Sequence, residues 1–594
     1  MYFKFLTLLS LPFLTQAVFA EETTAQTEAF VRQAAVVHKP TKLAHAVPRL
    51  IVLLVVDQMR SDQLSRFQKA MQKTAEGKRR GLLELRDRGV DFQEATVASA
   101  PSVTAAGHAS LCTGSAPRTH GIVGNSLFDR DLGREVSAAL DESTPLVYSQ
   151  GVLMQDALVR APSAGASPQR MLSKSFDQLL REVSDGKSRG LSVSIKDRGA
   201  IFCAGKQSAA YWYDSKSGSM VTSTFYASQM PDWVNSFNAS QRSRKAEPWA
   251  SLLTVEQMKE LLPSKKLKEA FDVRAEGSQW FGSGFPYSLK KNGEAAVVSH
   301  HKFQYSPQAS DLLVDFALEG IKNLRLGCRD RIPQSKCDSP LLPDVLTISF
   351  STTDLVGHAF GPDSPELMDI FLNLNKSVSR LMKELDSKFK RDEVLYIVSA
   401  DHGVQSAPEV LARAGRTGGR FNPSESVKSL EAQLVKIWGQ GPWINAIVTG
   451  EIHFNEAVFN RNKKKFSEAV ELLNKAPKIM GIHKFILLDP KLTEGQKTLS
   501  LYHKGLYPER SGQVLIQFNE GWTLDPWNVA SHGTAHPDDV RIPLIFSGWR
   551  VRSGVRLKTA ASADDAVPTV LSGLGLKLPK NVTGQSHAQD VFIP

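Results

Sequence analysis

The stretch RLIVLLVVD, residues 49–57, is an uninterrupted apolar run that ends in an acid, Asp57. A short run without alternating polar residues is typical of a strand that is buried on both faces of a parallel sheet. Similar runs are DVLTISF (344–350), EVLYIVSAD (393–401) and RIPLIFSG (541–548). We therefore predict that these four segments are parallel strands of one buried sheet.

The segment between the second and third of these runs has a helical pattern. In residues 364–390, apolar side chains recur at three- and four-residue steps from Leu367 to Leu385. Ser364 suits the N-cap of such a helix, and Pro365 suits its first turn. Strands that alternate with helices predict an α/β sandwich.

The domain organisation can be inferred from where this alternation is interrupted. The stretches at about 130–340 and 405–530 fit it poorly, and we interpret them as insertions that cap the sheet of one catalytic domain, residues 49–594. Residues 1–20 have a lysine, a short apolar stretch and a small-residue cleavage site, which predict a signal peptide. A membrane anchor is the alternative. Residues 21–48 are a polar lead-in, so we expect an exported, periplasmic protein without a transmembrane anchor.

Charge and cysteine content narrow the class of protein. The net charge of +11 over 594 residues is a mild basic bias that favours anionic substrates. No helix-turn-helix, zinc-finger or RNP-like pattern accompanies it, so we expect no nucleic-acid-binding module. Exported proteins form disulfides. Cys328 and Cys337 close a short polar loop and are the expected pair, with Cys112 and Cys203 free.

Acids and histidines gather at the predicted strand ends. Open α/β sheets bind ligands outside the carboxyl ends of their strands. The residues of this kind are Asp57, Asp354, Asp401, His358, His402 and His532. A single aspartate at a strand end is more often a helix cap or turn former, but this combination favours metal. Six such ligands exceed the need of one zinc ion, and two ions can clamp a phosphoryl group.

A candidate nucleophile lies in TAAGHASLCTG, residues 104–114, which predicts a helix that begins at Thr104. A hydroxyl at a helix N-terminus sits beside unpaired N–H groups and a positive dipole, an arrangement that binds anions. A metal-bound threonine alkoxide would be an activated nucleophile. Taken alone, a threonine in this position is more often a cap.

The order and context of these motifs resemble the alkaline phosphatase superfamily, in its branch with a threonine nucleophile. The matching motifs are VVDQM, SVTAAGH, HGIVGN, TTDLVGH, SADHG and SHGT. The resemblance implies a three-layer α/β sandwich with a mostly parallel central sheet and capping insertions. It also implies that Asn125, in HGIVGN, hydrogen-bonds a phosphoryl oxygen.

The same resemblance implies a two-zinc site and assigns its ligands. One zinc would be held by Asp354, His358 and His532. The other would be held by Asp57, Asp401, His402 and Thr104. TTDLVGH would then supply two ligands from one loop, and its glycine would let the backbone turn closely around the metal. The same ligand types would also suit manganese, iron or calcium.

A further motif distinguishes between members of the superfamily. SVSIKDRGAIFCAGK, residues 192–206, resembles a segment of the phosphate-irrepressible alkaline phosphatases, in which a lysine and an arginine face the phosphate. Lys196 and Arg198 would point the same way on an extended segment. A cationic pair suits the dianion of a phosphate monoester. Without the resemblance, a solvated basic turn would be the simpler interpretation.

These inferences predict a zinc-dependent phosphate monoester hydrolase that acts on small phosphate esters through a phosphothreonine at Thr104. A phosphodiesterase or nucleotide pyrophosphatase is the close alternative, because it shares the metal ligands, the threonine and the asparagine. A sulfatase would need a C/S-x-P-x-R motif, and the sequence has no residues in that spacing. Lipid-linked phosphoethanolamine transferases would need membrane spans, which are also absent from the sequence. A catalytically inactive binding protein would lack a ligand or the nucleophile, and all are present.

Overall fold

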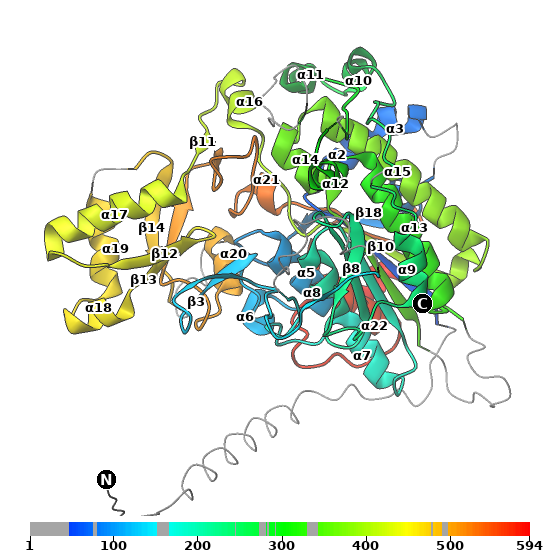
Figure 1. Cartoon of the computed structure of the whole chain (residues 1–594), viewed down its shortest axis with the longest axis horizontal. Helices are drawn as coiled ribbons and strands as arrows, with labels where there is room; N and C mark the ends of the chain where they lie inside the picture. Colours follow the sequence, from blue (N-terminus) through cyan, green and yellow to red (C-terminus); the bar gives the residue numbers. More distant parts are fainter. Residues whose placement is uncertain are drawn as a thin grey trace, which may run out of the picture.

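The computed structural model describes residues 47–74, 80–150, 165–243, 245–271, 281, 284–290, 293–328, 342–476, 479–489 and 497–594. Its main feature is a ten-stranded sheet with the strand order β18-β2-β17-β10-β1-β9-β6-β7-β8-β5 (Figure 1). The sheet is mixed, and its middle is parallel from β10 to β7. The predicted signal peptide and most of the lead-in lie outside the described residues.

Three central strands determine where the acids lie. They are β1 (Leu50–Val56), β9 (Asp344–Phe350) and β10 (Val394–Ser399), and every residue of them is buried. Val55 of β1 pairs with Ser349 on one side and Ser399 on the other, so the strands end nearly in step. The side chains just after these strands therefore meet at one edge of the sheet.

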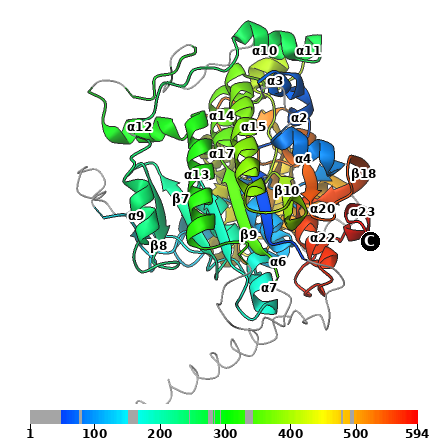
Figure 2. The same ribbon diagram turned by 90° about the vertical axis from the view of Figure 1, so that its right-hand side faces the viewer.

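Helices cover both faces of this sheet (Figures 1 and 2). One face carries α13 (Pro307–Asn323) and α15 (Pro365–Asp386), and the other carries α5 (Thr104–Thr113) and α8 (Asp197–Ala204). The predicted helix is confirmed as α15, because Ser364 Oγ accepts a hydrogen bond from the Leu367 amide and Pro365 lies in its first turn. The expected α/β sandwich is thereby confirmed. None of the helices in the described ranges is long and apolar enough to cross a membrane.

The structure corrects one predicted strand direction. The run at 541–548 forms β17 (Leu544–Gly548), which is antiparallel to β10 rather than parallel. Strand β17 also pairs antiparallel with β2 (Val90–Thr96), and β18 (Val555–Ser562) continues this side of the sheet. A buried apolar run has the same pattern in both directions, so the sequence could not distinguish them.

The two expected insertions differ from each other. Residues 130–340 do not simply cap the sheet, because they contribute four of its strands: β5 (Leu146–Val147), β6 (Gly190–Ser194), β7 (Ala209–Asp214) and β8 (Ser219–Ser223). Residues 405–530 include a separate antiparallel sheet of four strands, in the order β12-β13-β15-β14. This sheet has its own apolar core, which includes Trp443 and Phe459.

The strands of this smaller sheet are β12 (Ile444–Val448), β13 (Glu451–Phe454), β14 (Ile482–Leu487) and β15 (Val514–Phe518). Helices α17 (Pro423–Trp438), α18 (Glu456–Arg461) and α19 (Phe466–Lys475) flank it. Figure 1 shows this unit, in yellow and orange, to one side of the main sheet.

The disulfide that the structure shows is not the expected one. Cys112 of α5 is bonded to Cys203 of α8, which are 91 residues apart in the chain, so these two cysteines are not free. The expected partner of Cys328, Cys337, lies outside the described residues, and that pairing stays a prediction. The observed bond joins the helix that begins at Thr104 to the helix that begins just after Lys196.

Candidate active site

The predicted acids meet at the carboxyl edge of the central strands. Asp57 follows β1 and Asp401 follows β10, and both side chains are fully buried. Asp354 lies in the first turn of α14 (Thr352–Phe360), which begins directly after β9. It is therefore on a helix, not on the loop that we expected.

Helix α14 explains the spacing of Asp354 and His358. Residues four apart lie on the same face of a helix, and His358 Nε2 is 3.2 Å from Asp354 Oδ1. Gly357 between them does not turn the backbone. A Cβ on Gly357 would lie 1.8 Å from Oε1 of Gln58, so glycine is needed here for close approach.

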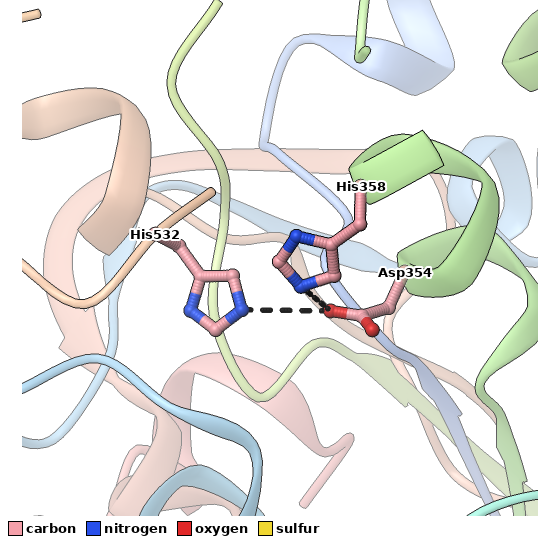
Figure 3. A group of neighbouring side chains, drawn as sticks. All are labelled: Asp354, His358 and His532. Carbon is pink, nitrogen blue, oxygen red and sulfur yellow. Dashed lines mark ion pairs between the residues drawn. The ribbon is translucent and has the colours of Figure 1, made fainter. Parts of the chain in front are cut away.

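His532 completes the first group of side chains that could hold a metal ion (Figure 3). Its Nε2 is 3.5 Å from Asp354 Oδ1. His358 Nδ1 donates a hydrogen bond to the Ala530 carbonyl at 2.8 Å, and His532 Nδ1 donates to the Ser102 carbonyl at 2.7 Å. Because Nδ1 of each ring is bound to a carbonyl, Nε2 is the nitrogen that faces Asp354 and is placed to bind a cation.

A second group surrounds His402. Its Nε2 lies 3.5 Å from Asp57 Oδ1, 3.4 Å from Asp401 Oδ2 and 3.3 Å from Thr104 Oγ1. Its Nδ1 donates to the Gly403 carbonyl at 3.0 Å, which again leaves Nε2 for a metal. Asp57 Oδ1 is buried and accepts no hydrogen bond from the described residues, whereas Asp401 Oδ2 has His108 Nδ1 at 3.2 Å. An orphaned carboxylate oxygen beside an imidazole nitrogen fits a zinc site.

Lys196 lies between the two groups. Its Nζ is 2.7 Å from Asp57 Oδ2 and 2.6 Å from Asp354 Oδ2, and it donates to Thr104 Oγ1 at 3.3 Å. Lys196 is the N-cap residue of α8, and Arg198 is already inside this helix, not on an extended segment as predicted. The Arg198 side chain is 28% exposed and lies 3.6 Å from Asp197.

The pKa shifts reflect this crowding of charge. Burial, followed by the charges of Asp354 and Asp401, raises the pKa of Asp57 well above its usual range. Burial would also raise the pKa of Asp354, but His358 and Lys196 hold it well below its usual value. Burial lowers the pKa of His402 to about 3, so its imidazole is neutral. A neutral imidazole is the form that binds metal.

Thr104 and Asn125 lie together at the start of α5. Thr104 is the first residue of the helix and is buried. Asn125 Oδ1 accepts a hydrogen bond from the Ala105 amide at 2.8 Å. Because that amide can only donate, the Asn125 Nδ2 group is left to donate to an oxygen atom bound beside Thr104.

Two buried residues that sequence reasoning missed contact the aspartates. Gln58 donates from Nε2 to Asp354 Oδ1 at 3.0 Å and from its backbone amide to Asp401 Oδ1 at 3.1 Å. His108 has Nδ1 3.2 Å from Asp401 Oδ2. The available signals were that Gln58 follows Asp57 and that His108 is one helical turn after Thr104.

Comparison with known proteins identifies the family. The model of the type I phosphodiesterase / nucleotide pyrophosphatase family matches residues 51–173 and 208–535. The chain belongs to this family. The predicted membership of the alkaline phosphatase superfamily is thereby confirmed.

Named relatives of this chain are similar to it over nearly their whole length. Alkaline phosphatase PhoV of Synechococcus elongatus is 31% identical over 91% of this chain and 92% of that protein. Alkaline phosphatase PafA of Elizabethkingia meningoseptica is 29% identical over 91% of this chain and 93% of its own length. A crystal structure of PafA superposes with a TM-score of 0.79 at 25% identity, covering 93% of this chain and all of that one.

Gln58 should determine how tightly metal is held, because it contacts a carboxylate of each ligand group. Removing a partner that orients ligands typically weakens metal binding about 10–100-fold. We expect Gln58→Ala to show a loss of this size when zinc is titrated into metal-free protein. Gln63→Ala is the matched control, since Gln63 is also buried and accepts a hydrogen bond from Arg60. Equal zinc affinity of Gln58→Ala and wild type would contradict the assigned role.

Proposed function

We propose that this protein is an exported alkaline phosphatase that hydrolyses phosphate monoesters through a phosphothreonine at Thr104 in a two-zinc site. The observation that carries the proposal is the position of Lys196, whose Nζ is within 3.3 Å of Thr104 Oγ1 and contacts carboxylates of both ligand groups. The similarity to PhoV and PafA, which are named alkaline phosphatases, supports it.

In the proposed reaction, each residue of the site has a defined role. Zinc held by the two groups would favour ionisation of the Thr104 hydroxyl and stabilise the leaving oxygen. Thr104 Oγ1 then forms a bond to phosphorus while the bond to the leaving oxygen breaks. The Asn125 Nδ2 group donates to a phosphoryl oxygen. Water attacks the phosphothreonine in a second step, which releases phosphate and restores the Thr104 hydroxyl.

Lys196 and Arg198 favour a monoester over a diester. A monoester carries two negative charges, and a diester replaces one charged oxygen by an ester group. Lys196 is nearly buried beside the nucleophile, where an ammonium group interacts strongly with charge. Arg198 Nε is buried and donates to no atom among the described residues, so it is free to bind an oxygen atom. The alternative is a phosphodiesterase, which the family description also covers.

Export is part of the proposal and rests on two observations. Residues 1–20 have the pattern of a signal peptide. The Cys112–Cys203 disulfide suits an oxidising compartment such as the periplasm.

Substrate choice tests the role of the cationic pair. Removing a preorganised donor from a phosphoryl site costs about 10²–10³-fold in rate. We expect Lys196→Ala and Arg198→Ala to lower kcat/KM for a monoester by this amount, and to lower it much less for a diester. Lys206→Ala is the control, because this lysine is exposed near the end of the same segment.

Equal losses on both ester types would mean that the pair supports folding or access instead. A wild-type protein that is faster on diesters than on monoesters would favour the phosphodiesterase alternative.

The covalent step can be tested directly at Thr104. Acid quenching during turnover of a ³²P-labelled monoester should place the label on the peptide that contains Thr104. Thr104→Ala should lose the label and most of the activity, because Thr104 supplies the hydroxyl that lies 3.3 Å from His402 Nε2 in the described part of the chain. Its zinc content should stay close to that of the wild type, since six ligands remain. A label on another residue would show that the nucleophile is wrongly assigned.

A further inference from the structure

The candidate site is not equally closed on all sides. The side chains of Asp57, Asp401 and His402 are fully buried, and that of His532 is 6% exposed. The side chain of His358, at 19%, is the most exposed of the proposed ligands. Among the proposed metal ligands, His358 is therefore the one most accessible to solvent.

The segment 525–530 packs directly on His358. The Val529 amide donates to the His358 carbonyl at 2.9 Å, and His358 Nδ1 donates to the Ala530 carbonyl at 2.8 Å. These two hydrogen bonds fix the segment to the open side of the site.

The same segment is held rigid from behind. Asp525 Oδ1 accepts from the amides of Trp527 and Asn528 at 2.8 and 3.2 Å. Arg420 donates to the carbonyls of Asn528 and Val529, and it also pairs with Glu409 at 2.8 Å. A backbone with so many partners keeps its conformation while its side chains remain available.

Trp527 extends from this rigid segment into solvent, with 88% of its surface exposed. It is three residues from Ala530, so the two Cα atoms are at most about 11 Å apart. An indole ring is large and apolar, and it commonly serves as a contact surface for flat ligands. An exposed indole on a backbone segment that is anchored at His358 has the properties of a stacking platform.

The direction of the leaving group depends on the proposed function, on which this inference rests. The attacking and leaving oxygens are roughly in line at phosphorus. Thr104 belongs to the His402 group, so the leaving oxygen faces Asp354, His358 and His532. The organic part of the ester then points outward past His358, toward the segment that carries Trp527.

We propose that Trp527 is a specificity-determining residue that stacks on the leaving group and favours phosphate esters of alcohols with a flat ring. The ring is either a simple aryl group or a nucleobase. Stacking of one ring on an aromatic side chain typically changes affinity by about 10-fold or more.

The test compares ring-bearing and ring-free monoesters on the zinc-loaded enzyme. We expect Trp527→Ala to lower the ratio of kcat/KM for phenyl phosphate to that for glycerol 2-phosphate about 10-fold, mainly through KM. Trp527→Phe should restore most of the ratio, because it keeps a ring. Adenosine 5′-monophosphate is the second ring-bearing substrate, and a larger effect on it than on phenyl phosphate would identify the nucleobase as the preferred ring. Met480→Ala is the control, since Met480 is 78% exposed and lies just before β14 of the smaller sheet.

A binding measurement separates this inference from the proposed function. Phenylphosphonate and methylphosphonate are not hydrolysed as esters, and calorimetry gives their affinities without turnover. Trp527→Ala should weaken the binding of phenylphosphonate much more than the binding of methylphosphonate, even if the enzyme prefers diesters. An unchanged ratio in both experiments, or equal losses for both members of each pair, would overturn the role of Trp527. Absence of monoesterase activity with a normal binding ratio would overturn only the proposed function.

Discussion

The main physical constraint on this structure is the repulsion between three buried carboxylates. The register of the central strands brings them together at one edge of the sheet. Asp57, Asp354 and Asp401 are all buried, and Lys196 is the lysine or arginine that contacts them within the described part of the chain. Three carboxylates and one ammonium group leave an excess of negative charge. Buried charge is costly unless it is paired or coordinates metal. The raised pKa of Asp57 reflects the cost of this buried negative charge in the protein without metal. Divalent cations would remove it.

Much of the site could be predicted because short apolar strands determine where the residues at their carboxyl ends lie. Asp57 and Asp401 each come two residues after the paired residues Val55 and Ser399, so neighbouring parallel strands bring them together. The position of His402 follows from that of Asp401, since the two residues are adjacent in the chain. The positions of Asp354 and His358 were predicted, but their helix was not. A single residue separates the end of β9 from the start of helix α14, and the glycine inside this helix resembles a turn signal.

The features that could not be predicted depend on contacts between distant segments. Cys112 and Cys203 are far apart in the chain and meet only because α5 and α8 pack together. The direction of β17 depends on its neighbours, not on its composition. Gln58 gains its role from a backbone conformation with φ of 68°, which is uncommon for a residue other than glycine. This conformation directs its amide groups to Asp354 and Asp401, one from each ligand group.

The helices on one face of the sheet connect the fold to the proposed chemistry. Helix α5 begins with Thr104 and α8 is preceded by Lys196, and the Cys112–Cys203 bond joins the two helices. The nucleophile and the cation beside it are therefore attached to one covalently joined pair of helices. Such an arrangement keeps reacting groups in place without movement of the sheet, which is what preorganised electrostatic stabilisation requires.

Locating the metal ions is the decisive test of the two-metal site. Crystals of zinc-loaded protein, measured on both sides of the zinc absorption edge, should show two anomalous peaks a few ångströms apart. One peak should lie among Asp354, His358 and His532, and the other among Asp57, Asp401, His402 and Thr104. The absence of metal between these carboxylates in a catalytically active crystal, or zinc bound only elsewhere in the protein, would contradict the two-metal site.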